Sequence, residues 1–190
     1  MILRFFSPPA IPSARRPMAR VPLNLFLSPS LPHPMIYATL KLVHVLSIVL
    51  WIGGMYFAHA FLRPAVQFLE PPMRIRLMHD VLQRFFTTVQ VVVLLVLFSG
   101  LWMIGRVAKE TVQAGLPFNM PLGWTVMATL GILMIVVFGH IRFALFKRLS
   151  RAVSASDWPA GGAALASIRT WVGVNLILGV ATIAATLLLG

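Results

Sequence analysis

The chain has 190 residues, 59% of them hydrophobic, and its mean hydropathy is +0.90. These values exclude an ordinary soluble globular domain. The formal net charge is +12, from 16 Lys and Arg against 4 Asp and Glu. Because the basic residues lie at the ends of apolar segments, membrane orientation and anionic lipid headgroups explain them better than nucleic acid does. Cys is absent, so a soft-metal site must use His and Met.

Residues 1–34 differ in composition from the rest of the chain. Eight of the 14 prolines fall there, together with four Arg and no acidic residue. Pro at this density prevents a continuous helix, which predicts a disordered tail. The alternative, which we favour, is that the tail precedes a natural start at Met35, because exporting an acid-free basic tail conflicts with the orientation derived below.

Four apolar segments follow the tail. Residues 42–62, 85–105, 111–141 and 170–190 contain no Asp, Glu, Lys or Arg. Each is long enough for a helix to cross the bilayer core, which needs about 20 apolar residues. We therefore expect transmembrane helices near 39–62, 82–105, 122–146 and 167–189. The expected fold is an all-α membrane protein whose residues 35–190 form one four-transmembrane-helix bundle.

The basic residues predict the orientation of these helices. Nine of them flank the connections between the first and second and between the third and fourth helices: Arg63, Arg74, Arg76, Arg84, Arg142, Lys147, Arg148, Arg151 and Arg169. Three lie on the other side: Lys41, Arg106 and Lys109. Because Lys and Arg concentrate in cytoplasmic loops, we expect a multi-pass protein with both termini outside and anionic lipid headgroups at the cytoplasmic loops.

The two halves of the chain resemble each other in short stretches. Residues 57–59, Phe-Ala-His, align with residues 138–140, Phe-Gly-His, at an offset of 81. In the following helices an Arg stands six residues before an amide, as Arg84 and Gln90 and as Arg169 and Asn175, at an offset of 85. A repeat would make the bundle two tandem helical hairpins in parallel orientation. Chance similarity between apolar helices is the alternative.

The first predicted helix carries a polar and soft-ligand face. At about 100° per residue, one face collects Lys41, His44, Trp51, Met55 and His59. Lipid offers these side chains no partners, so we expect the face to point into the bundle. His44 would lie near the outer boundary, with a backbone carbonyl or Ser47 as the structural alternative to a ligand role. Gly53 and Gly54 lie off this face and would let a neighbouring helix approach closely.

Each predicted helix also has one polar residue near its cytoplasmic boundary. His59, Gln90, His140 and Asn175 lie two to six residues inside their boundary arginines, within roughly 10 Å of that boundary. One interpretation is a polar clasp that sets helix register and includes Gln90, Asn175 and Lys41. The other is a ligand role for the two imidazoles, and their similar depth makes His59 and His140 the pair that could clamp one metal centre.

The acidic residues exclude some chemistries. Glu70, Asp80, Glu110 and Asp157 all lie outside the predicted spans, so an acid-based proton relay through the membrane is excluded. The sequence has no Gly-rich phosphate loop after a strand and no Ser-His-Asp pattern. It identifies no catalytic residues, and whether the protein is an enzyme stays open.

Five runs of sequence carry a family resemblance. They are TLKLVHVLSIVLWIGGMYFAHAFLRPA (39–65), RLMHDVLQRFF (76–86), SGLWM (99–103), FGH (138–140) and IRTWVGVNLILG (168–179). Together they resemble CopD-like membrane proteins of bacterial copper resistance. The layout is also similar to the HemJ family of protoporphyrinogen oxidases, small four-helix proteins with a Lys-x-x-His near the start of the first helix, matched here by Lys41 and His44.

The resemblance implies two functions, in a bacterial inner membrane. The first is copper passage or delivery across that membrane, with His44 as the outer ligand, Met55 below it, and His59 and His140 on the cytoplasmic side. A periplasmic copper carrier or a redox partner, and a homo-oligomer, would be compatible with it. The second is binding of haem b, or haem-dependent porphyrinogen oxidation, with His44, His59 or His140 as axial ligands. A third hypothesis is structural, in which the polar residues only specify packing.

Overall fold

The computed structural model describes residues 33–189, which form helices joined by short connections. In chain order the elements are α1 (His33–Phe57), the π-helical segment η2 (Ala58–Leu62), α2 (Arg63–Ala65), α3 (Pro71–Gln113), α4 (Leu122–His140), the π-helical segment η3 (Ile141–Leu145), α5 (Phe146–Ser154) and α6 (Trp158–Leu189). The predicted tail lies outside the described residues except at its last two positions, where α1 begins.

Four helical stretches of the described chain are long and apolar enough to cross a membrane: Met35–Ala65, Pro71–Gln113, Leu122–Ser154 and Trp158–Leu189. This confirms the predicted all-α four-helix membrane bundle. The first and second stretches run further than predicted at both ends, and the third and fourth at one end. The largest difference is at the start of the second stretch. This stretch begins at Pro71 rather than near residue 82, because Pro at the first positions of a helix lacks only an N–H that the helix does not use.

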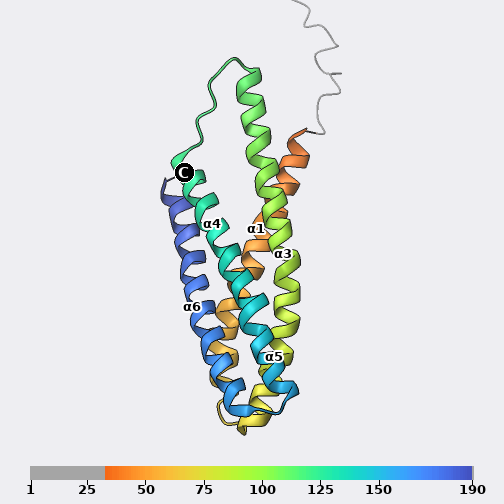
Figure 1. Cartoon of the computed structure of the whole chain (residues 1–190). Helices are drawn as coiled ribbons and strands as arrows, with labels where there is room; N and C mark the ends of the chain where they lie inside the picture. The colour runs from red at the N-terminus through yellow and green to blue at the C-terminus, as the bar shows by residue number, and fades with distance from the viewer. Residues whose placement is uncertain (1–32, 190) are drawn as a thin grey trace, which may run out of the picture.

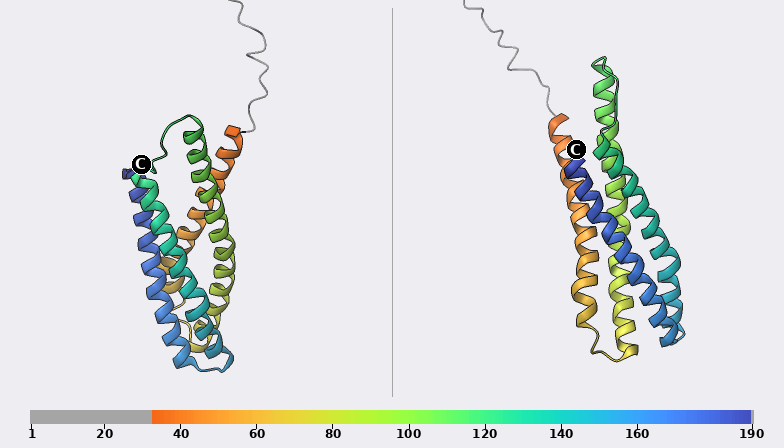
Figure 2. Two further views of the ribbon diagram at one scale, coloured as in Figure 1. Left: turned by 45° about the horizontal axis from the view of Figure 1, so that its top comes forward. Right: turned by 90° about the vertical axis from the view of Figure 1, so that its left-hand side faces the viewer.

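The helices form two hairpins that lie side by side. α1 packs against α3, and α4 packs against α6. The start of α1 and the end of α6 lie at one end of the bundle, which we call the terminus-bearing end, and the connections 66–70 and 155–157 lie at the other, the hairpin end (Figure 1). The upper turns of α3 extend beyond the neighbouring helices (Figure 2). The bundle therefore has the arrangement that two tandem hairpins would produce.

The outer surface of the bundle is apolar. Phe98, Leu101 and Ile177 expose 68%, 61% and 70% of their surface. Side chains of this kind cover the membrane-facing sides of the helices, where lipid tails solvate them. The surface is that of a protein embedded in a bilayer.

Aromatic side chains hold the two hairpins together. The Trp51 ring on α1 meets Phe138 on α4 edge-on at a centroid distance of 6.0 Å. Phe86 on α3 contacts both Phe138, at 6.1 Å, and Phe146, at 5.4 Å. Within lipid, helices associate through close packing rather than through a hydrophobic driving force. These contacts fix the depth at which the hairpins meet.

One of the two predicted close-approach glycines lies in a tight helix contact. A Cβ added at Gly54 would overlap the Phe85 ring on α3, whereas one added at Gly53 would meet no described atom within 4 Å. Gly54 therefore permits the close approach of α1 and α3, and Gly53 faces outward. The two neighbours make a matched pair for testing that contact.

Candidate functional site

The buried face of α1 supplies most of the candidate side chains. His44, Ser47, Trp51 and Met55 are exposed by only 9%, 6%, 3% and 2%. Their spacing of three or four residues places them on one side of a helix, and that side points into the bundle. Lys41, at the start of the predicted face, is exposed, and His59, at its end, is half-buried.

His44 is held by Ser99 on α3 rather than by Ser47. The His44 Nδ1 atom lies 2.9 Å from the Ser99 Oγ atom. The Ser99 hydroxyl can also donate within its own helix, to the carbonyl oxygen of Leu95. The contact between Nδ1 and Oγ holds the imidazole against α3 in either tautomer. A hydrogen bond of this kind fixes the ring orientation of a metal-binding His.

Gly100 makes room for the same imidazole. A Cβ added at Gly100 would lie 3.2 Å from the His44 Cε1 atom. The pair Ser99-Gly100 therefore forms a cradle that orients the ring from the facing helix.

Met55 and Asn175 meet in the centre of the bundle. The Asn175 Nδ2 atom donates to the Met55 Sδ atom at 3.8 Å, across α1 and α6. Asn175 is 1% exposed. Its Oδ1 atom is buried without a hydrogen-bond partner among the described residues. A buried amide oxygen that lacks a partner raises the free energy of the fold. It is an acceptor available to a bound group beside a thioether.

Met134 on α4 brings a second thioether into the core. The side chain is 4% exposed. A Cβ added at Gly179 on α6 would lie 3.1 Å from the Met134 Cε atom and 2.9 Å from the Ile52 Cδ1 atom. Because both side chains contact the same position of α6, Met134 lies at the level of Ile52, between His44 and Met55 along α1.

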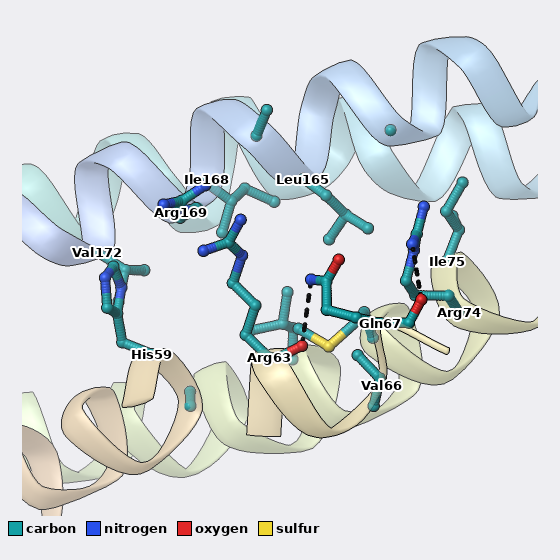
Figure 3. Close-up of a pocket in the computed structure, with 15 residues that line it drawn as sticks. His59, Arg63, Val66, Gln67, Arg74, Ile75, Leu165, Ile168, Arg169 and Val172 are labelled. Atoms are coloured by element: carbon teal, nitrogen blue, oxygen red, sulfur yellow. Dashed lines mark hydrogen bonds between the residues drawn. The ribbon is translucent and has the colours of Figure 1, made fainter. Parts of the chain in front are cut away.

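His59 lies at one end of a pocket at the hairpin end. The residue belongs to η2, and its Cε1 atom would be 3.5 Å from a Cβ added at Gly173 on α6. Figure 3 shows its imidazole beside Val172 at the edge of the pocket. π-Helical turns are rare and are frequent at functional sites, so η2 distinguishes this stretch of the first helix.

His140 does not face His59. It is exposed at the end of α4, and its ring meets Trp171 of α6 at a centroid distance of 5.1 Å. His59 contacts the Gly173 position, two residues further along α6. Two residues correspond to about 200° of helix rotation, so the two imidazoles lie against opposite sides of α6. The structure does not bring His59 and His140 together as the two ligands of one metal centre.

The residues predicted to form a polar clasp are also not brought together in the structure. Gln90 and Lys41 are exposed on the outside of α3 and α1, whereas Asn175 is in the core. A polar contact between the hairpins forms instead at His79 of α3, whose Nε2 atom lies 3.1 Å from the Ser150 Oγ atom of α5. The ring of His79 also stacks on Phe146 at 5.2 Å.

The His and acidic side chains of the described residues do not cluster into a metal centre. Within residues 33–189, no group of three or more His, Cys, Asp or Glu side chains could hold a metal ion together. The imidazoles and thioethers are instead distributed along the length of α1 and its neighbours.

Three residues of this arrangement are absent from the sequence-based candidates: Ser99, Gly100 and Met134. Ser99 and Gly100 begin the SGLWM run used for the family resemblance, and a small residue pair inside an apolar helix is typical of a helix interface. Met134 has no such signal, because Met fills apolar cores readily.

Comparison with known proteins identifies the family. The family model described as copper resistance protein D matches residues 79–189, which is more than half of the chain. No curated protein and no solved structure matches. The matched region contains α4, α6 and most of α3, and therefore includes Ser99, Met134 and Asn175. The chain belongs to the copper resistance protein D family of multi-pass membrane proteins.

Proposed function

We propose that this protein carries Cu(I) across the membrane through the interior of the four-helix bundle. The observation that supports it is a series of metal-binding side chains on the inward face of α1 and beside it: His44, Met134, Met55 and His59. We call these four residues the donor series. Copper is the substrate that moves along the series, and no residue has to hold it permanently.

The chemistry of the donor series favours Cu(I) over harder cations. Thioethers select Cu(I) and imidazoles also bind copper, whereas Mg²⁺ and Ca²⁺ need carboxylates and carbonyl oxygens. An ion in a bilayer loses its water, so protein donors must replace it. At the centre, the Met55 thioether has the unpartnered Asn175 Oδ1 as a neighbouring acceptor.

The spacing of the donor series fits stepwise passage. At about 1.5 Å per residue, His44 and Met55 are about 16 Å apart along α1, and His59 is about 6 Å further. Met134 divides the longer interval, because it lies at the level of Ile52. His44 is the ligand of the series nearest the terminus-bearing end, because it lies closest to the start of α1. His140 is outside the series, since it is exposed on the far side of α6.

We further propose that the membrane is a bacterial inner membrane and that the hairpin end faces the cytoplasm. The nine basic residues that flank the two hairpin connections support this orientation. A C-terminal alkaline phosphatase fusion should be active in cells and a C-terminal fluorescent fusion dark. The reverse pattern would place the hairpin end outside the cell, and His44 would then lie near the cytoplasmic side of the membrane.

Cu(I) flux into liposomes tests the proposal. Reconstituted protein should carry Cu(I) to a chelating dye inside the vesicles, and His44→Ala and Met55→Leu should each slow the flux by at least about tenfold, or about 1.4 kcal/mol on the barrier. His140→Ala is the matched control, because it removes an exposed imidazole from the same bundle. Full flux in both His44→Ala and Met55→Leu would contradict the proposal.

A further inference from the structure

The hairpin end contains a pocket of about 230 Å³ between the first hairpin and α6. Its wall combines side chains from η2, α2, α3 and α6, together with the connection after α2. Three of its lining residues are arginines, each from a different element: Arg63 from α2, Arg74 from α3 and Arg169 from α6. Figure 3 shows the guanidinium of Arg63 extending into the space below Arg169.

The positive charge of this pocket is not neutralised by the protein. No Asp or Glu is among the lining residues. In the part of the chain that the structure describes, the ion pairs are His79 with Asp80 and Arg106 with Glu110, and neither involves the pocket. Arg74 donates to the carbonyl oxygen of Gln67 at 3.5 Å. That single weak contact leaves most guanidinium donors of the pocket available.

Apart from the polar His59 and Gln67, the rest of the pocket wall is apolar. Val66, Ile75, Leu82, Ile168 and Val172 line it, and all five are buried. The pocket lies around the end of the first membrane-spanning stretch at Ala65, with lining residues from Ala58 to Gln67. A ligand with a negatively charged group and an adjoining apolar part would match both halves of this wall.

We propose that this pocket binds a phosphate group, with Arg63, Arg74 and Arg169 as its donors. Guanidinium groups present planar, paired N–H donors that match phosphate oxygens, and such charge-assisted bonds are among the strongest in proteins. Three guanidiniums from separate elements supply more donors than one carboxylate accepts. The phosphate belongs either to a phospholipid headgroup or to a soluble phosphate compound. The proposal rests on the three arginines and does not depend on copper transport.

Binding measurements on purified full-length protein in a phosphate-free maltoside detergent test the site. The probes are short-chain phosphatidylglycerol, followed by native mass spectrometry, and inorganic phosphate, followed by the rise in Tm. The variant is Arg63→Gln/Arg169→Gln. Its control is Arg148→Gln/Arg151→Gln, which removes the same charge from exposed positions of α5 at the same end. The pocket variant should bind at least about tenfold more weakly than the control.

The two probes distinguish the sources of the phosphate. If the pocket variant loses phosphatidylglycerol binding but keeps the phosphate-induced rise in Tm, the site binds a lipid headgroup. If it loses the rise in Tm but keeps phosphatidylglycerol binding, the site binds a soluble phosphate compound. Equal binding by the pocket variant and its control, with both probes, overturns the proposal. If Arg63→Gln/Arg169→Gln does not fold, Arg63→Lys/Arg169→Lys keeps the charge but loses the paired donors, and it should still bind several-fold more weakly than the unmodified protein.

Discussion

The two hairpins share a local sequence pattern, but the corresponding side chains differ in how deeply they are buried. In each, the first helix passes through a π-helical segment at its His, η2 around His59 and η3 directly after His140. In each, the second helix has an Arg followed six residues later by an amide. Yet His59 is half-buried while His140 is exposed, and Asn175 is buried while Gln90 is exposed.

The side chains that we propose as copper ligands are therefore divided unequally between the hairpins. At the offsets of 81 and 85 residues, His44, Met55 and Ser99 of the first hairpin correspond to Thr125, Val136 and Ala184 of the second. The second hairpin instead supplies Met134 and Asn175 from positions whose counterparts are Gly53 and Gln90. The two hairpins thus enclose a single asymmetric interior, to which each contributes different polar and sulfur-containing side chains.

The largest expected effect is a difference in Cu(I) flux between variants of the two amide side chains, Asn175 and Gln90. Asn175→Leu should slow Cu(I) flux by at least about tenfold, because it removes the polar neighbour of the Met55 thioether. Gln90→Leu should leave the flux unchanged, since Gln90 faces outward. Flux into liposomes measures both variants.

Thermal unfolding of the same two variants is the control for folding. Polar pairs across membrane helices contribute about 0.6 kcal/mol on average, so neither variant should lose much stability. Equal flux in the two variants would remove the functional difference between the hairpins.

The next effect concerns the contact within the first hairpin. Gly54→Ala should destabilise the bundle by about 1–3 kcal/mol, because the new methyl group overlaps the Phe85 ring and forces it to move. Gly53→Ala should be neutral or slightly stabilising, since Ala favours helix and no described atom lies near its Cβ. Chemical denaturation in detergent measures the difference, and similar stabilities for the two variants would show that α1 and α3 do not pack as closely as the structure has them.

The smallest expected effect tests the orientation of His44. Ser99→Ala removes the hydrogen-bond partner of the His44 Nδ1 atom, which should cost about 1 kcal/mol of stability and reduce Cu(I) flux a few-fold. Ser47→Ala is the matched control, as Ser47 is buried on the same face of α1. The prediction fails if Ser47→Ala reduces the flux as much as Ser99→Ala does, because Ser47 would then be the partner of His44.

The local sequence was enough to predict which side chains of the first helix point into the bundle. The three- and four-residue spacing of His44, Trp51 and Met55 predicts a shared face, and a polar face in lipid has to point inward. The structure has all three buried. The partner of His44 was not predictable in this way, because Ser99 is 55 residues away and one of several small residues in an apolar helix.

The sequence by itself determined the number of membrane spans and their apolar character, because the length of a charge-free run and the cost of an unpaired backbone in lipid leave a helix as the available structure. Only the tertiary structure decided which polar residues enter the core. The sequence predicts a similar membrane depth for Gln90, His140 and Asn175, because depth follows from the distance along one helix. Whether a side chain points into the core depends instead on how its helix is rotated relative to its neighbours. That rotation is set by contacts such as Trp51 with Phe138 and Gly179 with Ile52, which join residues far apart in the chain.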